Sequence, residues 1–123
     1  MTTPASAADR AMVAARAALD KKGTDVAILE VGDVLAIIET FVLASAANVR
    51  QVRTIVEHVE ECVAEADGGK PTSIEGMSDA SWVLMDYGDV VVHVFLDETR
   101  AFYDLDRLWA DVPRIDVAVP QTT

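Results

Sequence analysis

The sequence predicts a mixed α/β domain in which a roughly five-stranded sheet is flanked by helices. Three observations predict this fold class. Short apolar runs of strand length alternate along the chain with segments of helical periodicity. A long helical segment between two strand-like runs implies a right-handed crossover and a parallel pair of strands. Two later apolar runs, separated by a tight turn, imply an antiparallel hairpin.

The length and composition of the chain indicate one domain. The 123 residues are 51% hydrophobic and 25% charged, which is typical of a globular chain. We expect a single domain over residues 1–123, with loose tails at about 1–5 and 114–123. No apolar run reaches the roughly 18 residues of a transmembrane helix. The start of the chain lacks the pattern of a secretory signal, so we expect a cytoplasmic protein with no membrane partner.

The first part of the chain predicts a helix followed by two strands. Ser6 and Asp9 have the spacing of a capping box, and the Ala-rich stretch that runs on to Lys22 favours a helix. Residues 26–31 and 37–45 are nearly continuous in apolar side chains, many of them β-branched. Such runs are typical of central strands that are covered on both faces.

Residues 48–67 give the clearest helix in the sequence. Valines recur at spacings of three and four, Asn48 can cap the start, and Gly68 follows the end. Cys62 widens the apolar stripe and is interpreted as a core residue, because a free cysteine behaves as a small hydrophobe. His58 precedes Cys62 by four residues, but two ligands alone are a weak metal signal, so we predict no metal site.

The later part of the chain predicts three strands and then short helices. A weak strand is expected at 72–75, and two strong strands at 81–86 and 89–96, with a turn at Tyr87-Gly88 between the strong pair. In the last strand, alternation puts one set of residues on each face of the sheet: Val90, Val92, Val94 and Leu96 on one, and Val91, His93 and Phe95 on the other. Asp97 is expected to cap a helix that runs through Tyr103, and a further helical turn ends at Pro113.

The charge balance limits the kind of partner. The chain has 10 Lys and Arg against 21 Asp and Glu, which gives a net charge of −11. Such a field repels nucleic acid, so we expect no direct sequence-specific binding of DNA or RNA. A basic protein is the favoured large partner.

Motifs for catalysis or cofactor binding are missing from the sequence. There is no Walker A motif, GxGxxG, GxSxG or HExxH, so no cofactor is expected. Asp86 and Asp89 flank the hairpin turn, and paired carboxylates can hold a divalent ion or act as acid and base. A small nucleotidyltransferase-like enzyme that uses these two residues with a metal ion is the alternative function. The simpler interpretation is that aspartate favours turns.

Aromatic residues gather in the segment 82–109. Both Trp, both Tyr and two of the three Phe lie there, which is a composition typical of a protein interface. A core concentrated in the same segment is the competing interpretation. Phe95, Phe102 and Leu108 are assigned to the core, and Tyr87, at the tip of a turn, to the interface.

The same segment resembles a known family. Residues 82–95, which read Trp-Val-Leu-Met-Asp-Tyr-Gly-Asp-Val-Val-Val-His-Val-Phe, resemble the signature of the Iojap family, the ribosomal silencing factor S proteins. The resemblance covers about residues 8–117 and continues in shorter matches at 41–43, 50–52, 75–76, 100–105 and 108–109. Residues 45–48 depart from it, because Ser-Ala-Ala-Asn stands where the family usually has Thr-Gly-x-Ser. No function is assigned to that loop.

The resemblance implies a nucleotidyltransferase-like fold without enzyme activity. It implies binding to ribosomal protein uL14 of the large subunit, which blocks subunit joining and represses translation. Some members are dimeric, so a homodimer is possible. The predicted contact face is built from the hairpin and the short helix after it, where the family motif matches and each residue carries a polar group: Asp86, Tyr87, Asp89, His93, Arg100 and Tyr103.

Overall fold

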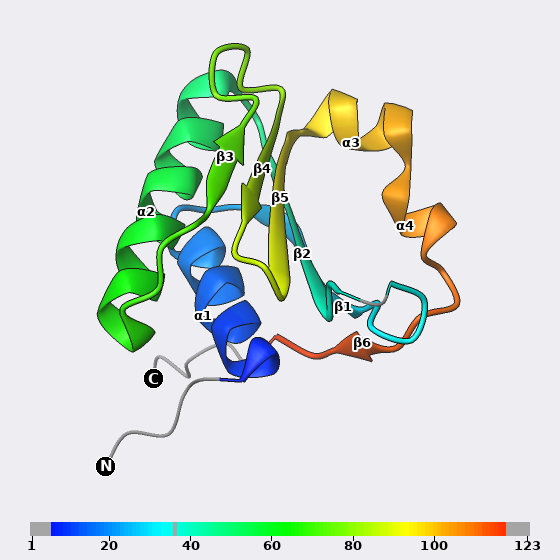
Figure 1. Ribbon diagram of the computed structural model, residues 1–123. Coiled ribbons are helices and arrows are strands. Elements are labelled where there is room, and N and C mark those ends of the chain that lie inside the picture. Colours follow the sequence, from blue (N-terminus) through cyan, green and yellow to red (C-terminus); the bar gives the residue numbers. More distant parts are fainter. Residues whose placement is uncertain (1–5, 36, 118–123) are drawn as a thin grey trace, which may run out of the picture.

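The computed structural model describes residues 6–35 and 37–117. The elements follow in the order α1 (Ala7–Asp20), β1 (Thr24–Glu30), β2 (Thr40–Ala46), α2 (Val49–Asp67), β3 (Ser73–Glu75), β4 (Trp82–Asp86), β5 (Val90–Leu96), α3 (Asp97–Tyr103), α4 (Leu105–Leu108) and β6 (Arg114–Ile115) (Figure 1). The mixed α/β class is confirmed. The predicted loose tails at 1–5 and 118–123 lie outside the described residues.

Within residues 6–35 and 37–117 the sheet has six strands, in the order β3-β4-β5-β2-β1-β6. The central strands β2 and β5 are parallel, and every other neighbouring pair is antiparallel. The sixth strand is β6, which pairs with β1 where a loose tail was predicted. The parallel pair exists, but the strand directly after α2 does not form it. That strand, β3, is three residues long with exposed ends, and it pairs antiparallel with β4 at the sheet edge.

The helices α1 and α2 cover one face of the sheet (Figure 1). Six alanines of α1 are buried, and their small side chains let the helix pack closely on α2 and on the strands. The valines predicted to form the apolar stripe of α2 are buried in the same core. Asn48 caps α2 by accepting a hydrogen bond from the Gln51 amide at 2.8 Å, and Gly68 ends it with a φ of 74°. Both predicted helix ends are confirmed.

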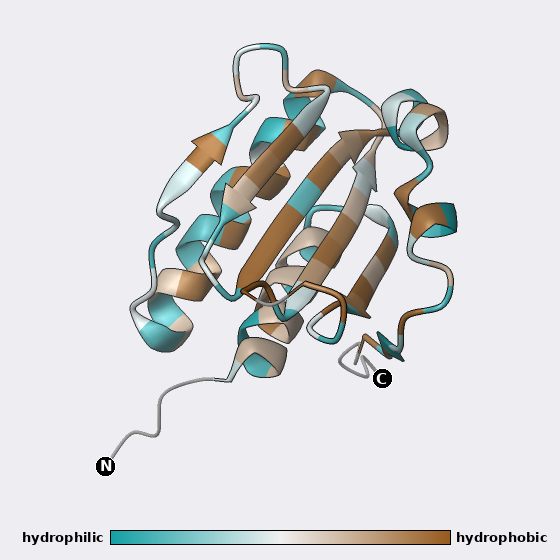
Figure 2. Ribbon diagram, turned by 45° about the vertical axis from the view of Figure 1, so that its right-hand side comes forward, coloured by the Kyte–Doolittle hydropathy of each residue, from teal (hydrophilic) through white to brown (hydrophobic). Residues whose placement is uncertain are grey.

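The opposite face of the sheet, called here the open face, has a smaller cover. It is covered by residues 31–35 and 37–39 and by the chain around α3 and α4, and Figure 2 shows apolar residues along the central strands beneath them. Its hydrophobic core contains six buried residues in the described part of the chain: Leu29, Val31, Phe41, Leu43, Val91 and Phe95. The two faces of β5 carry the residues that alternation predicted.

Several local predictions are wrong. The second strand begins at Thr40 rather than at residue 37, and Ile37 is 82% exposed. Phe102 and Leu108 are 81% and 71% exposed rather than buried in the core, because the short helices turn these side chains away from the sheet. Asp97 is the first residue of α3 and makes no capping bond.

The loop over residues 45–48 needs no glycine in this chain. Ala46 is the last residue of β2, and the positive φ values among described non-glycine residues lie elsewhere, at Lys22, Asp25, Ala80 and Asp104. In the part of the chain that the structure describes, no helix is long and apolar enough to cross a membrane.

Candidate protein-binding face

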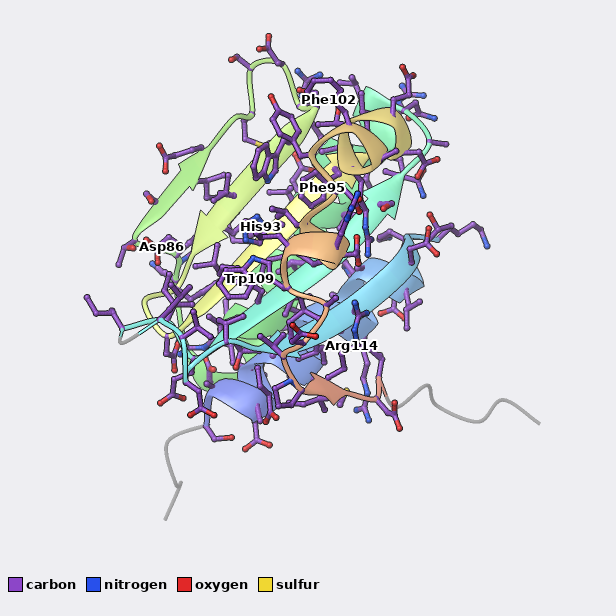
Figure 3. The ribbon with its side chains drawn as sticks, turned by 90° about the vertical axis from the view of Figure 1, so that its right-hand side faces the viewer. Asp86, His93, Phe95, Phe102, Trp109 and Arg114 are labelled. Carbon is purple, nitrogen blue, oxygen red and sulfur yellow. The ribbon has the colours of Figure 1, made fainter. Side chains whose placement is uncertain are left out.

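A chain of aromatic rings runs across the open face and is called here the aromatic row. Its neighbouring members are Phe102, Tyr103, Trp82, Phe95, His93, Phe41 and Trp109, whose ring centroids are separated in turn by 5.1, 4.8, 5.1, 6.0, 4.7 and 5.5 Å. The rings come from α3, β4, β5, β2 and the residue after α4, so the tertiary fold assembles the row (Figure 3). Edge-to-face and offset contacts at these spacings add to the stability of a packed aromatic cluster.

The aromatic row passes from the core into solvent. Phe95 is fully buried and Trp82 is half-buried, whereas Tyr103 is 53% and Phe102 is 81% exposed. Leu108, on the next short helix, is 71% exposed. Large apolar side chains that are held rigidly at their base and exposed at their tip are typical of the anchors of protein interfaces.

His93 lies in the middle of the row and is buried, with 5% of its surface exposed. Its Nδ1 accepts a hydrogen bond from the indole Nε1–H of Trp82 at 3.1 Å, so the ring proton lies on Nε2. The Nε2 atom has no hydrogen-bond partner among the residues that the structure describes. Burial lowers the pKa of His93 to about 4, so the ring is neutral near pH 7. The hydrogen bond fixes the indole ring, which in turn packs against the ring of Tyr103.

The chain between β3 and β4 also positions Trp82. Gly76 has a φ of 91°, and a Cβ at this residue would overlap the carbonyl oxygen of Trp82. Only glycine allows the backbone to approach this closely. The Glu75-Gly76 pair, which the sequence singled out as part of a family pattern, therefore has a local role beside the tryptophan.

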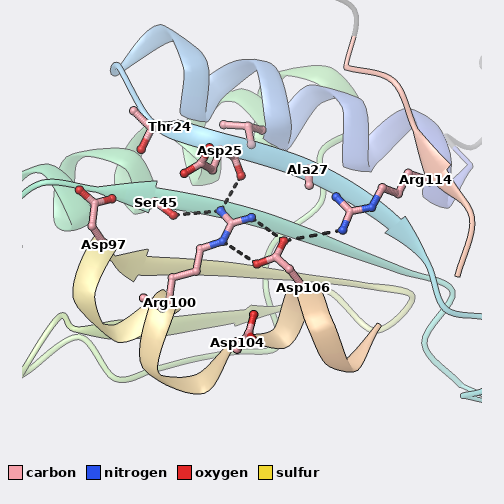
Figure 4. A pocket seen from close by; sticks show the side chains of 11 residues that line it. Thr24, Asp25, Ala27, Ser45, Asp97, Arg100, Asp104, Asp106 and Arg114 are labelled. Carbon is pink, nitrogen blue, oxygen red and sulfur yellow. Dashed lines mark hydrogen bonds and ion pairs between the residues drawn. The ribbon is translucent and has the colours of Figure 1, made fainter. Parts of the chain in front are cut away.

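Arg100 fastens α3 and α4 to the sheet (Figure 4). Its Nε and Nη2 donate to the two carboxylate oxygens of Asp106 at 3.0 and 2.8 Å. Its Nη1 donates to Ser45 Oγ on β2 at 2.9 Å and to the carbonyl oxygen of Asp25 on β1. The hydrogen bond from Arg100 holds the pKa of Asp106 below its usual range. With 9% of its surface exposed, Arg100 holds the aromatic side chains of α3 in place and has little surface left for a partner.

Tyr87 and Asp89 face the helix side of the sheet. Tyr87 is 7% exposed, its ring lies 5.5 Å from the Arg10 guanidinium of α1, and burial raises the pKa of its phenol to about 12. The Asp89 carboxylate lies 3.3 Å from Arg10, which also donates to Asp67 at 2.9 Å and lowers the pKa of that carboxyl. These contacts fasten the hairpin turn to the helices.

The hairpin turn has the predicted form. Gly88 has a φ of 93°, and the Tyr87 amide donates to the Val90 carbonyl at 2.9 Å. Asp86 accepts a hydrogen bond from the Gly88 amide at 2.8 Å and shares its face of β4 with Trp82 and Leu84. Among the predicted contact residues, Asp86, His93 and Tyr103 therefore lie on the open face, whereas Tyr87 and Asp89 do not.

Sequence reasoning missed Trp82, Phe102 and Leu108 as candidate contact residues. The hairpin register carries a signal for Trp82, because it pairs with Phe95 across β4 and β5 and stands on the His93 face. The exposure of Phe102 and Leu108 has no comparable signal in the sequence.

The two carboxylates of the catalytic alternative do not converge. Asp86 bonds the turn amide on the open face, and Asp89 pairs with Arg10 on the helix side. Within residues 6–35 and 37–117, no group of three or more His, Cys, Asp and Glu is arranged to hold a metal ion.

His58 Nε2 lies 3.2 Å from Asp20 and 3.5 Å from Cys62 Sγ. Cys62 is half-buried rather than a full core residue, and burial raises the pKa of its thiol, which opposes activation.

A mixed α/β domain with an aromatic face, and without converging catalytic groups among its described residues, has the features of a protein-binding domain. Comparison with known proteins identifies its family. Residues 4–123 match the family described as ribosomal silencing factor during starvation. The chain therefore belongs to the ribosomal silencing factor family, whose members are ribosome-associated translation regulators rather than enzymes.

Individual relatives agree with the family assignment. The ribosomal silencing factor of Bacillus subtilis is 34% identical over 105 residues, which cover 85% of this chain and 88% of the relative. The chloroplastic protein Iojap of Zea mays is 32% identical over 84% of this chain and 44% of its own length. A crystal structure of a Chromobacterium violaceum protein is 31% identical and matches with a TM-score of 0.82, covering 94% of this chain and 95% of that one.

Proposed function

We propose that this protein represses translation in the cytoplasm by binding ribosomal protein uL14 on the large ribosomal subunit and blocking subunit joining, without catalysis. The aromatic row, exposed where it reaches α3, is the observation that carries the proposal. A phenylalanine that is 81% exposed beside a tyrosine that is 53% exposed adds little to folding stability, whereas a partner that covers both would bury their apolar surface. Family membership supports the ribosome as the place where that partner lies.

The charges around the exposed end of the row favour a basic partner. Asp97, Glu98 and Asp104 are exposed on α3 or at its end, close in sequence to Phe102 and Tyr103. The chain as a whole carries a net charge of −11. Apolar anchors surrounded by carboxylates fit a ribosomal protein whose surface is basic. The rim charges would mainly speed the encounter with it.

We assign the contact to Trp82, Phe102 and Tyr103 as anchors, with Asp86 at the edge of the same face. His93 supports this surface through its bond to Trp82. In this proposal Tyr87, Asp89 and Arg100 hold the hairpin and the short helices in position rather than contact uL14. Their hydrogen bonds, ion pairs and ring contacts within the chain support that role.

Sedimentation with isolated subunits tests the proposed function. The chain is expected to pellet with large subunits and not with small ones, and to slow the formation of whole ribosomes when the subunits are mixed. The second measurement follows light scattering as subunits join, with a chain of similar mass and charge as control. Equal recovery with both subunits, or unchanged joining at saturating protein, overturns the proposal.

A second copy of this chain is the competing occupant of the exposed row. We propose that any homodimer leaves Phe102 and Tyr103 available, because the same residues cannot serve uL14 and a stable dimer at once. Sedimentation velocity of the free chain and of a Phe102→Ala variant tests this point. A dimer that dissociates in the variant contradicts it.

A further inference from the structure

The cations of this acidic chain fall into two groups. All 10 Lys and Arg lie within the described residues. Arg10, Arg53, Arg100 and Arg114 have acceptor or carboxylate partners, and Arg16 also has an interaction within the chain. Across the described residues, five cationic side chains have no hydrogen-bond or ion-pair partner: Lys21, Lys22, Arg50, Lys70 and Arg107.

Three of these five unpaired cations line one hollow. Lys21, Lys22 and Arg50 surround a depression between the end of α1 and the start of α2, and they are called here the basic corner. All three residues are exposed. The one carboxylate that lines the hollow, Asp20, lies 3.2 Å from His58 Nε2. A cluster of free positive charge is thus present on a chain whose net charge is −11.

Gln51 fixes the geometry of the basic corner. Its Nε2 donates to the carbonyl oxygens of Lys21 and Lys22 at 3.1 and 2.9 Å, and its Oε1 accepts from the Ala47 amide at 2.8 Å. The backbone positions of the three cations are therefore set relative to one another. The Gln51 amide itself donates to the Asn48 side chain, so this amide is not available to a ligand.

The helix dipole accounts for Lys21 and Lys22, which follow the C-terminal end of α1, but it does not account for Arg50. The first turn of α2 has no acidic residue and its last turn no basic one, while Arg50 stands near the start and Asp67 at the end. The helix dipole favours the opposite order. A cation that the dipole of its own helix disfavours, and that has no hydrogen-bond or ion-pair partner among the described residues, is more simply explained by a contact outside the chain.

The basic corner and the exposed aromatic row lie at the same edge of the sheet. Strands β2 and β5 are parallel, and α2 and α3 follow their respective carboxyl ends. Both helices therefore begin at one edge, with α2 on the helix side and α3 on the open face (Figure 1). A large particle that contacts α3 can also reach the basic corner.

We propose that the basic corner binds the phosphate backbone of ribosomal RNA while the aromatic row holds the protein partner. The inference rests on the proposed function, because RNA surrounds any protein on a large subunit. The overall charge of the chain repels free RNA, but surface charges more than about 10 Å apart are largely screened at 0.1 M salt. Three local cations can thus make phosphate contacts without sequence specificity once the chain is held nearby.

The test measures binding to isolated large subunits over a series of salt concentrations. Each phosphate contact adds about 0.7–0.9 to the slope of log affinity against log salt. Lys21→Gln should therefore lower the slope by about 0.8, and Lys21→Gln combined with Arg50→Gln by about 1.6. Lys70→Gln removes an equal charge outside the corner and should leave the slope unchanged. All variants should bind isolated uL14 as the wild type does.

Each other outcome counts against the proposal in a distinguishable way. Equal slopes in all proteins, or the same decrease in Lys70→Gln, overturn it. Loss of affinity for isolated uL14 in the double variant shows that the corner contacts protein and overturns the RNA assignment.

If the wild type does not bind large subunits, the proposed function fails, and a 20-base-pair RNA duplex at low salt then tests the corner alone. Retention of the duplex by the wild type and not by the double variant supports the corner. Equal behaviour of the two proteins, or binding to phosphatidylglycerol vesicles in place of the duplex, overturns it.

Discussion

The two faces of the sheet use the same strands for different purposes. On the helix side, Val90, Val92 and Val94 of β5 pack with small aliphatic residues of α1 and α2 in a fully covered core. On the open face, Val91, His93 and Phe95 of the same strand join a core whose aromatic side chains continue into solvent. The helix side contributes only to stability, whereas the open face also exposes side chains that a partner can contact. Substitutions on the two faces should therefore separate folding from binding.

The largest difference is expected between a buried and an exposed apolar side chain of similar size. Ile55 is fully buried on the helix side, and Leu108 is 71% exposed beside the open face. Ile55→Ala should lower the free energy of unfolding by about 2–5 kcal/mol, because it leaves a cavity. Leu108→Ala should cost less than about 0.5 kcal/mol. Urea unfolding measures both, and similar losses in the two variants would contradict the described burial.

A pH-dependent loss of stability is expected from the open face through His93. The unfolded imidazole has a pKa near 6.5 and the folded one a pKa of about 4, so between these values the unfolded state binds more protons. The stabilisation from neutral, buried His93 should be fully present above pH 6.5. The free energy of unfolding should then fall by up to about 3 kcal/mol as the pH drops toward 4.

A histidine variant checks the source of that pH dependence. His93→Gln should show a nearly flat stability between pH 4 and 6.5, measured by urea unfolding at each pH. An unchanged slope in His93→Gln would show that the buried imidazole is not its source.

A smaller loss of stability is expected when the hydrogen bonds of Arg100 are removed. Arg100→Ala leaves Asp106 and Ser45 without their donor and should cost about 2 kcal/mol, less than a fully buried pair because Asp106 is 33% exposed. Arg114→Ala is the control, since Arg114 is 46% exposed and lies 3.8 Å from Asp106. Thermal and urea unfolding should show little change there. Equal costs would mean that Arg100 does not hold α3 and α4.

Stability at low pH, the acid limb of the stability curve, gives a second measure of the Arg100–Asp106 pair. Because the pKa of Asp106 is lowered in the fold, its pairing stabilises the chain above the ordinary aspartate pKa of about 3.9 and is lost as the pH falls below it. Arg100→Ala should remove this part of the loss of stability at low pH. An acid limb identical to that of the wild type would contradict the pairing.

The features predicted correctly from the sequence depend on local patterns. The span and caps of α2, the hairpin turn at Gly88 and the two faces of β5 all follow from spacing, turn chemistry and alternation. The surroundings of Tyr87 and Arg100 depend on residues far away in the chain. Arg100 bonds Ser45 and Asp25, which precede it by 55 and 75 residues, and Tyr87 packs against Arg10. No local pattern contains these contacts.

The exposure of the aromatic row also lies beyond a local pattern. Hydrophobicity assigned Phe102 and Leu108 to the core, but the two short helices present both side chains to solvent. The positive φ of 49° at Asp104 separates α3 from α4 and lets the chain change direction between them. A single aspartate in the left-handed region is hard to predict from sequence. The turn that it makes decides which apolar residues become available to a partner.

The affinity for isolated uL14, measured together with the melting temperature, tests the central claim most directly. Phe102→Ala combined with Tyr103→Ala removes the exposed end of the row, and Val34→Ala combined with Ile37→Ala removes two similarly exposed apolar side chains elsewhere, 63% and 82% exposed. Anchor loss should weaken uL14 binding by roughly thirtyfold or more, corresponding to about 2 kcal/mol, with the melting temperature nearly unchanged. The control should bind as the wild type does. Wild-type affinity in the Phe102 and Tyr103 variant, or an equal loss in the control, would contradict the assignment of the contact to the exposed end of the aromatic row.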